Sequence, residues 1–116
     1  MTIGKIFSIG VIMGKIQELT EFNSYKNIPG ENNSHDVQLV TISTCVWCNR
    51  LKRLLNENKV DYDYIDIDLI QRGEKNRLKN LLYDYTDRLS FPMCFIDGEL
   101  VQGFKENIIK NKLGVD

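Results

Sequence analysis

The chain has 116 residues, of which 42% are hydrophobic, and its formal net charge at pH 7 is −1. This length suits a single domain with a modest core, and the hydrophobic content is too high for a disordered chain. The near-neutral charge argues against nucleic acid as the main partner, and the absence of a run of ~18 apolar residues argues against a membrane-spanning helix.

The three cysteines, Cys45, Cys48 and Cys94, set an expectation about the compartment. An odd number this small is too low for a secreted scaffold held together by disulfide bonds. A reducing environment is the simpler expectation, so the sequence predicts a cytoplasmic protein.

Residues 1–36 are predicted to be an N-terminal extension and connector ahead of a domain at residues 37–116. Apolar side chains in the first part recur at intervals of three or four, namely at Ile9, Ile12, Ile16, Leu19 and Phe22. This spacing predicts a short amphipathic helix that rests on the domain, with docking to a partner or a membrane surface as the alternative. Residues 23–36 are predicted to be a turn-rich connector.

From Val37 onward, the apolar spacing predicts an alternation of strands and helices. The predicted strands cover residues 37–42, 62–68, 93–96 and 99–102, and the predicted helices cover residues 46–58, 74–85 and 105–113. The first strand–helix–strand unit implies parallel strands, and Asp97-Gly98 predicts a tight antiparallel hairpin. The expected fold is therefore α/β, with a four-stranded mixed sheet flanked by three helices.

Cys45 and Cys48 stand where the first predicted strand passes into the first predicted helix. A helix N-terminus presents unpaired N–H groups and partial positive charge, which favours a thiolate there. We expect Cys45 to be the exposed sulfur and Cys48 to lie about one turn further along, within its reach. The pair predicts a dithiol–disulfide redox site, in which Cys45 attacks a disulfide and Cys48 resolves the mixed disulfide.

Several motifs occur together in one order: Thr44-Cys45-Val46-Trp47-Cys48, Ser90-Phe91-Pro92, the stretch from Cys94 to Gly98, and Gly103. With these motifs, residues 37–113 resemble a glutaredoxin, a member of the thioredoxin-fold superfamily, which implies a three-layer thioredoxin-like fold and a thiol–disulfide oxidoreductase. The resemblance also implies a cis peptide bond at Pro92 beside the sulfurs, and pairing of the Phe91 backbone with an extended substrate. It implies further substrate contacts from Thr44, Val46, Trp47, Arg88, Gly103 and Phe104.

The chain departs from the glutathione-using members of that family at three places. No lysine stands shortly before Cys45, Gln102 replaces one of two adjacent glycines, and residues 104–107 replace an acidic pair. These departures count against glutathione without excluding it, and no cofactor beyond the redox-active disulfide is expected. The stretch from Gly103 to Lys105 resembles glutaredoxin-like redoxins of glutathione-poor microbes and those that supply electrons to ribonucleotide reductase.

The resemblance implies disulfide-bearing proteins as substrates and either a reductase or glutathione as the reductant, for a protein expected to be a monomer. A dedicated electron donor to ribonucleotide reductase, an iron–sulfur cluster or metal carrier, and a non-catalytic module that docks through residues 1–22 are the alternatives. The cluster remains open because no proline separates the two cysteines, and some members of the family bridge a cluster between two chains.

Three further side chains, Thr44, Trp47 and Cys94, have expected roles beside the redox pair. Thr44 is expected to cap the first helix. Trp47 either offers a flat surface to a partner protein or shields the site. Cys94 is expected to be a buried structural thiol. A zinc site formed by Cys45, Cys48, Cys94 and His35 would have the right number of ligands, but Cys94 would have to face Cys45, so no metal is predicted.

Overall fold

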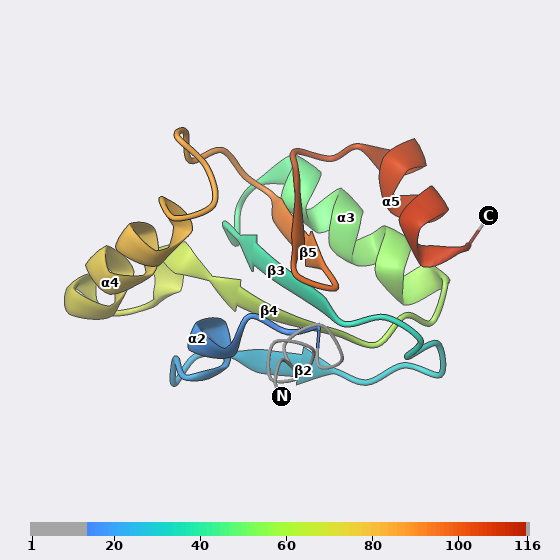
Figure 1. The fold of residues 1–116 in the computed structure, drawn as a ribbon, viewed down its shortest axis with the longest axis horizontal. Helices are drawn as coiled ribbons and strands as arrows, with labels where there is room; N and C mark the ends of the chain where they lie inside the picture. The colour runs from blue at the N-terminus through green and yellow to red at the C-terminus, as the bar shows by residue number, and fades with distance from the viewer. Residues whose placement is uncertain (1–13, 116) are drawn as a thin grey trace, which may run out of the picture.

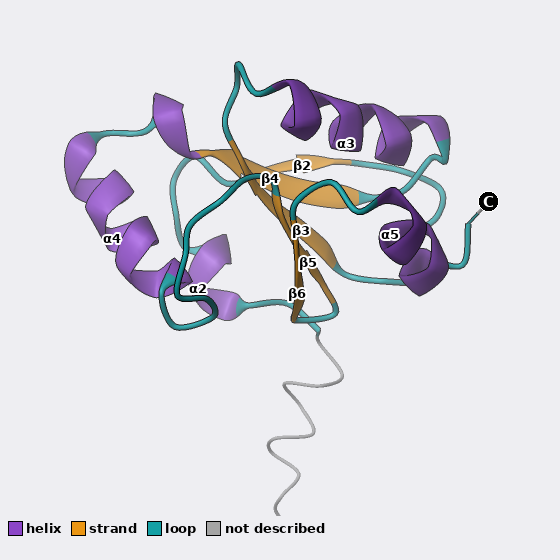
Figure 2. Cartoon of the chain, turned by 90° about the horizontal axis from the view of Figure 1, so that it is seen from above, coloured by secondary structure: helices purple, strands orange, loops and turns teal. Residues whose placement is uncertain are grey.

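The computed structural model describes residues 14–115, which form a mixed sheet between two layers of helices (Figures 1 and 2). The strands are β2 (Lys26–Ile28), β3 (Val37–Thr41), β4 (Tyr62–Asp66), β5 (Met93–Ile96) and β6 (Glu99–Gln102). The helices are α2 (Gln17–Thr20), α3 (Val46–Glu57), α4 (Arg72–Leu82) and α5 (Glu106–Leu113), with a 3₁₀ turn at Ile67–Leu69 after β4. Within this part of the chain, no helix has the length and apolar character needed to cross a membrane.

The strand order across the sheet is β2-β4-β3-β5-β6. Strands β3 and β4 are parallel and are connected through α3, whereas β5 pairs antiparallel with β3 and β6 pairs antiparallel with β5. The predicted α/β class and the seven elements from Val37 onward are confirmed, with shifts at several ends. The largest shift is in α4, which begins and ends before the predicted range of 74–85.

The predicted number of strands was wrong, because the sheet formed by residues 14–115 has five strands and not four. The additional strand, β2, lies in the segment predicted to be a turn-rich connector and pairs antiparallel with β4. It has only three residues, and Lys26 and Asn27 are exposed, so it shows no alternation of apolar and polar side chains. Its partner lies far away in the sequence, and only the tertiary structure reveals the pairing.

The two faces of the sheet carry separate apolar clusters. One cluster packs α3 and α5 against the sheet, and the other packs α2 and α4 against the opposite face. All five residues of the central strand β3 are buried. The thioredoxin-like three-layer arrangement is thereby confirmed, and it places the N-terminus of α3 at the end of the central strand.

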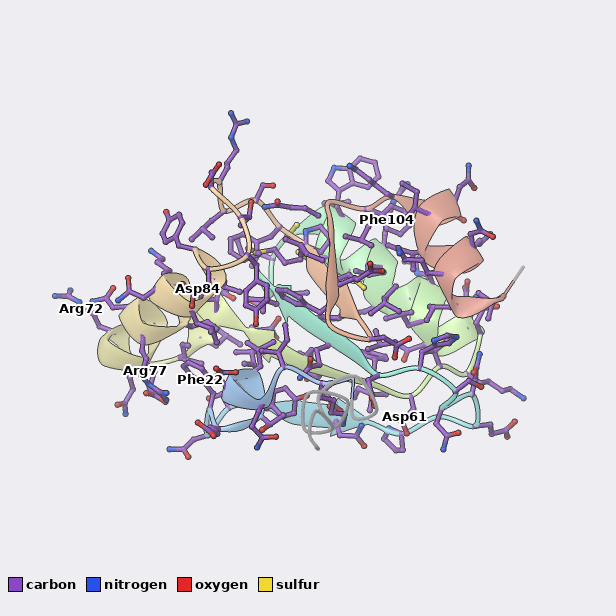
Figure 3. All side chains as sticks on the ribbon, viewed as in Figure 1. Phe22, Asp61, Arg72, Arg77, Asp84 and Phe104 are labelled. Carbon is purple, nitrogen blue, oxygen red and sulfur yellow. The ribbon has the colours of Figure 1, made fainter. Side chains whose placement is uncertain are left out.

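The predicted helix at residues 1–22 falls partly outside the described residues, including Ile9 and Ile12. In the described part, only Gln17–Thr20 is helical, yet Ile16, Leu19 and Phe22 are buried in the cluster beneath α4. Phe22 also lies beside Arg77, whose guanidinium carbon is 4.0 Å from the centre of the ring (Figure 3). The apolar spacing therefore identified the packed face correctly.

A buried polar network ties this segment to the sheet. Gln38, which is 1% exposed, accepts a hydrogen bond from Ile16 N–H at 2.8 Å and donates one to the Tyr25 hydroxyl at 2.9 Å. Asp63 accepts hydrogen bonds from Lys15 at 2.9 Å and from the Tyr25 hydroxyl. Burial alone would raise the pKa of Asp63, but these donors hold that pKa below its usual range. Residues 15–25 are thus attached through satisfied hydrogen bonds.

Candidate active site

The two sulfurs lie at the first turn of α3. Cys45 is the N-cap residue, and its partly exposed Sγ accepts a hydrogen bond from the backbone N–H of Cys48 at 3.3 Å. Cys48 is fully buried, and its Sγ accepts one from Ile42 N–H at 3.5 Å. The expected cap at Thr44 was wrong, because α3 begins at Val46 and the capping position therefore falls on Cys45 itself.

The surroundings make the two thiols chemically unequal. Burial, together with the hydrogen bond to Cys45, raises the pKa of Cys48 to about 12. Cys48 is therefore a neutral thiol at neutral pH, and a neutral thiol is a poor nucleophile. Cys45, at the helix N-terminus, is the sulfur that a substrate can reach.

An ion pair between α3 and β4, which the sequence did not predict, lies one helical turn after Cys48. Lys52 follows Cys48 by one helical turn, and its Nζ lies 3.0 Å from Asp66 Oδ1. The same oxygen accepts a hydrogen bond from the Thr41 hydroxyl at 2.6 Å. Both charged side chains are mostly buried, so this ion pair links α3 to the end of β4. Only the i, i+4 spacing of Cys48 and Lys52 is visible in the sequence.

The peptide bond between Phe91 and Pro92 is cis, which confirms that prediction. The carbonyl of Pro92 accepts a hydrogen bond from Gly103 N–H at 2.8 Å. Gly103 has φ of +88°, a conformation that glycine adopts without the steric cost that a side chain would bring. Gly103 thus belongs to the same loop junction as Pro92.

A group of aromatic and cationic side chains flanks the first turn of α3. The rings of Trp47 and Phe104 are stacked, with centroids 6.0 Å apart, and the guanidinium carbon of Arg50 lies 5.0 Å from the Trp47 ring centre. Figure 3 shows Phe104 at the approach to α5. Trp47 is 51% exposed and Val46 is 64% exposed, as expected for residues between the two cysteines. A cleft of about 180 Å³ next to this stack is lined by Arg50, Arg53, Leu54, Glu57, Phe104 and Glu106.

A second cleft adjoins Phe91 on the side of α4. Its volume is about 210 Å³, and it is lined by Ile42, Ile67, Asp68, Lys75, Lys79 and Phe91. Lys75 and Lys79 of α4 therefore border the same cleft as Phe91. Nothing in the local pattern indicates this position, because it depends on how α4 packs on the sheet.

Arg88, another predicted contact residue, has an exposed side chain. In the described part of the chain, the hydrogen bonds at Arg88 are made by its backbone: its carbonyl accepts from Gln102 Nε2 at 2.6 Å, and its N–H donates to the Thr86 hydroxyl at 3.3 Å. The structure therefore places Arg88 in the loop before Pro92, with its backbone bonded to Thr86 and Gln102.

Cys94 and His35 lie apart from the cysteine pair. Cys94 is fully buried in the apolar cluster beneath α3 and α5, and this burial raises its pKa to about 12. His35 Nδ1 lies 2.7 Å from Asp97 Oδ2, at the hairpin between β5 and β6. Among residues 14–115, no group of three or more His, Cys, Asp or Glu side chains is placed to hold a metal ion. The four ligands of the zinc alternative are therefore not brought together.

Comparisons with known proteins agree with this geometry. The glutaredoxin family model matches residues 37–101, more than half of the chain. The solved structure of a glutaredoxin from Methanosarcina mazei is similar with a TM-score of 0.69 and 31% identity, over 79% of this chain and 89% of that one. The Methanosarcina acetivorans methanoredoxin structure gives a TM-score of 0.64 and 34% identity, over 68% of this chain and 84% of that one.

Among curated proteins, human mitochondrial glutaredoxin-2 is 27% identical over 67 residues, which are 58% of this chain and 40% of the human protein. The chain spans 40% to 49% of the length of the first three curated relatives that it matches. The family model, the solved structures and the arrangement of cysteines, cis-proline and glycine all lead to one assignment. The chain belongs to the glutaredoxin family.

Proposed function

We propose that this protein is a dithiol–disulfide oxidoreductase that reduces the disulfides of proteins or small molecules through the Cys45-Val46-Trp47-Cys48 site. The observation that carries the proposal is the inequality of the two sulfurs. Cys45 is partly exposed at a helix N-terminus, and Cys48 is buried within one turn of it, with a pKa of about 12. The exposed sulfur suits attack on a substrate, and the buried one suits an intramolecular second step.

The reaction proceeds in two exchanges. The Cys45 thiolate attacks one sulfur of the substrate disulfide, forms a mixed disulfide and expels the first substrate thiolate. Cys48 then gives up its proton and attacks Cys45 Sγ, which breaks the mixed disulfide and releases the second substrate thiolate. The proton of Cys48 ends on a leaving thiolate. The protein is left with a Cys45–Cys48 disulfide, and a two-electron reductant restores both thiols.

The surroundings of the pair support a disulfide-bearing protein as the substrate. Phe91, which precedes the cis-proline, is partly exposed and lines a cleft together with Ile42, and Trp47 is half-exposed between the two cysteines. We place the protein in the cytoplasm as a monomer. Three cysteines are too few for a secreted scaffold held together by disulfide bonds, which supports a reducing compartment.

The proposed activity predicts stoichiometric oxidation of the cysteine pair. Reduced protein mixed with a peptide disulfide is expected to form one Cys45–Cys48 disulfide per peptide disulfide reduced, and to turn over when a reductant is supplied. Trp47, the only tryptophan, lies between the two cysteines in the sequence, so its fluorescence can follow the reaction. Because no lysine stands shortly before Cys45, we expect a thioredoxin reductase or a ferredoxin-linked reductase to act faster than glutathione. Rapid reduction by glutathione would reverse that preference, and no oxidation by the peptide would reject the activity.

The cleft beside Phe91 predicts a preference for substrates with an acidic residue near the reactive cysteine. Lys75 and Lys79 border this cleft one turn apart, and they outnumber its one acidic lining residue, Asp68. Lys79→Glu is expected to raise KM for an acidic peptide disulfide roughly twofold to fivefold, the scale of one exposed charge pair, without changing kcat. The effect should shrink at high salt.

A neutral peptide disulfide and the variant Arg72→Glu provide the controls. Arg72 is exposed at the start of the same helix, and its replacement changes the net charge by the same amount (Figure 3). Lys79→Glu should leave KM for the neutral peptide nearly unchanged. Arg72→Glu should leave KM for the acidic peptide nearly unchanged. Equal effects of the two variants, or equal effects on the acidic and neutral peptides, would show that the cleft does not select by charge.

A further inference from the structure

We infer that Gln102 is a positioning residue for the substrate-binding loop. Its side-chain amide fixes the segment of residues 86–90 that leads into Phe91 and Pro92, and thereby sets how tightly an extended substrate binds. This inference rests on the proposed function, and it assigns to Gln102 a role in affinity rather than in the chemistry at the sulfurs.

The side chain of Gln102 joins the end of β6 to this loop through both ends of its amide. Nε2 donates to the carbonyl of Arg88 at 2.6 Å and to the carbonyl of Ser90 at 3.3 Å. Oε1 accepts from the Thr86 hydroxyl at 3.0 Å. The backbone of Gln102 is held in register opposite Met93, directly after the cis-proline. One side chain therefore connects three residues of an irregular loop to a paired strand.

The next residue, Gly103, completes the attachment from the backbone. Its N–H donates to the carbonyl of Pro92 at 2.8 Å. The carbonyls on both sides of Phe91, those of Ser90 and Pro92, are therefore bonded within the protein. The backbone of Phe91 is the proposed partner of a substrate strand. The hydrogen bonds at Ser90 and Pro92 fix its position on each side.

A loop fixed before binding lowers the entropy cost of binding, because fewer conformations are lost when the substrate docks. Gln102 bonds to the loop, and none of its described hydrogen bonds involves Cys45 or Cys48. Loss of the amide should therefore weaken the binding of a substrate that lies along the loop, while the rate of thiol–disulfide exchange in the bound complex stays the same.

The test replaces Gln102 with methionine, which keeps the length of the side chain and removes its hydrogen bonds. For a peptide disulfide, Gln102→Met is expected to raise KM about fivefold to tenfold with kcat unchanged, the scale of one or two lost neutral hydrogen bonds. For bis(2-hydroxyethyl) disulfide, which is too short to lie along the loop, kcat/KM should stay within about twofold. Amide hydrogen exchange at residues 87–91 should become faster in the variant.

Two further variants separate this role from a general loss of stability. Gln102→Glu retains the acceptor for Thr86 and lacks the donors for Arg88 and Ser90, so it should reproduce the rise in KM. Glu99 lies on the same strand, is exposed and pairs with Lys112. The variant Glu99→Gln should therefore leave every readout unchanged. Proportional loss of activity toward both substrates, or an unchanged KM for the peptide, would overturn the inference. If the wild type reduces neither disulfide, the proposed function fails, and the substrate role of Gln102 fails with it.

Discussion

Replacing Cys45 with serine is expected to lower kcat/KM for a peptide disulfide by ~10³-fold or more, the scale of effect seen when a covalent nucleophile is removed. A serine hydroxyl does not ionise near neutral pH and forms no mixed disulfide. The fold should survive, because serine is a favoured N-cap residue whose Oγ can accept the Cys48 N–H as the sulfur does at 3.3 Å. The first measurement is the rate of disulfide reduction. The second is the thermal midpoint of unfolding, and this midpoint should change little.

Cys94→Ala is the matched control for the loss of a thiol. Cys94 is buried in the apolar cluster beneath α3 and α5. Its replacement should leave kcat/KM within about twofold and lower the free energy of unfolding by about 1 kcal/mol, a usual cost for a buried truncation. Retained activity in Cys45→Ser, or an equal loss in Cys94→Ala, would contradict the assignment of Cys45 as the nucleophile.

The residues that the sequence identified are those whose signals are local. Cys45 and Cys48 are three residues apart at a strand–helix junction, and Pro92 directly precedes a short apolar strand. Asp97-Gly98 marks its hairpin with two neighbouring residues of positive φ, as the dipeptide predicted. For such features, the composition of a few consecutive residues already restricts the backbone, and the family resemblance supplied their relative placement.

The residues that the sequence did not identify act through contacts between distant segments. Gln102 was recognised only as a departure from a glycine, because its bonds to Arg88 and Ser90 depend on the register of β6 against β5. Lys52 meets Asp66 only once β3 and β4 are parallel neighbours. Strand β2 was missed for the same reason, since its polar sequence becomes a strand only by pairing with β4.

The asymmetry of the two thiols predicts a trapped intermediate in the variant Cys48→Ser. Without a second thiol, the mixed disulfide between Cys45 and the substrate cannot be resolved within the protein and should accumulate. Mass spectrometry of the digested protein should find one substrate half attached to Cys45, whereas the wild type should show a Cys45–Cys48 disulfide and no adduct. An adduct on Cys48 of the wild type, or none on Cys45 of the variant, would reverse or remove the assigned roles.

The same asymmetry predicts how the two thiols respond to pH when each stands alone in a Cys94→Ala background. In Cys45→Ser, Cys48 loses the interaction with the Cys45 thiol but keeps the burial that is the larger cause of its raised pKa, so it remains protonated at pH 7. Its alkylation by iodoacetamide should be slow there and should rise about tenfold per pH unit above pH 7, because only the thiolate reacts. In Cys48→Ser, the partly exposed Cys45 should be alkylated far faster at pH 7. Equal rates at pH 7 would mean that the burial of Cys48 does not suppress its reactivity, and the order of the two exchange steps would lose its physical basis.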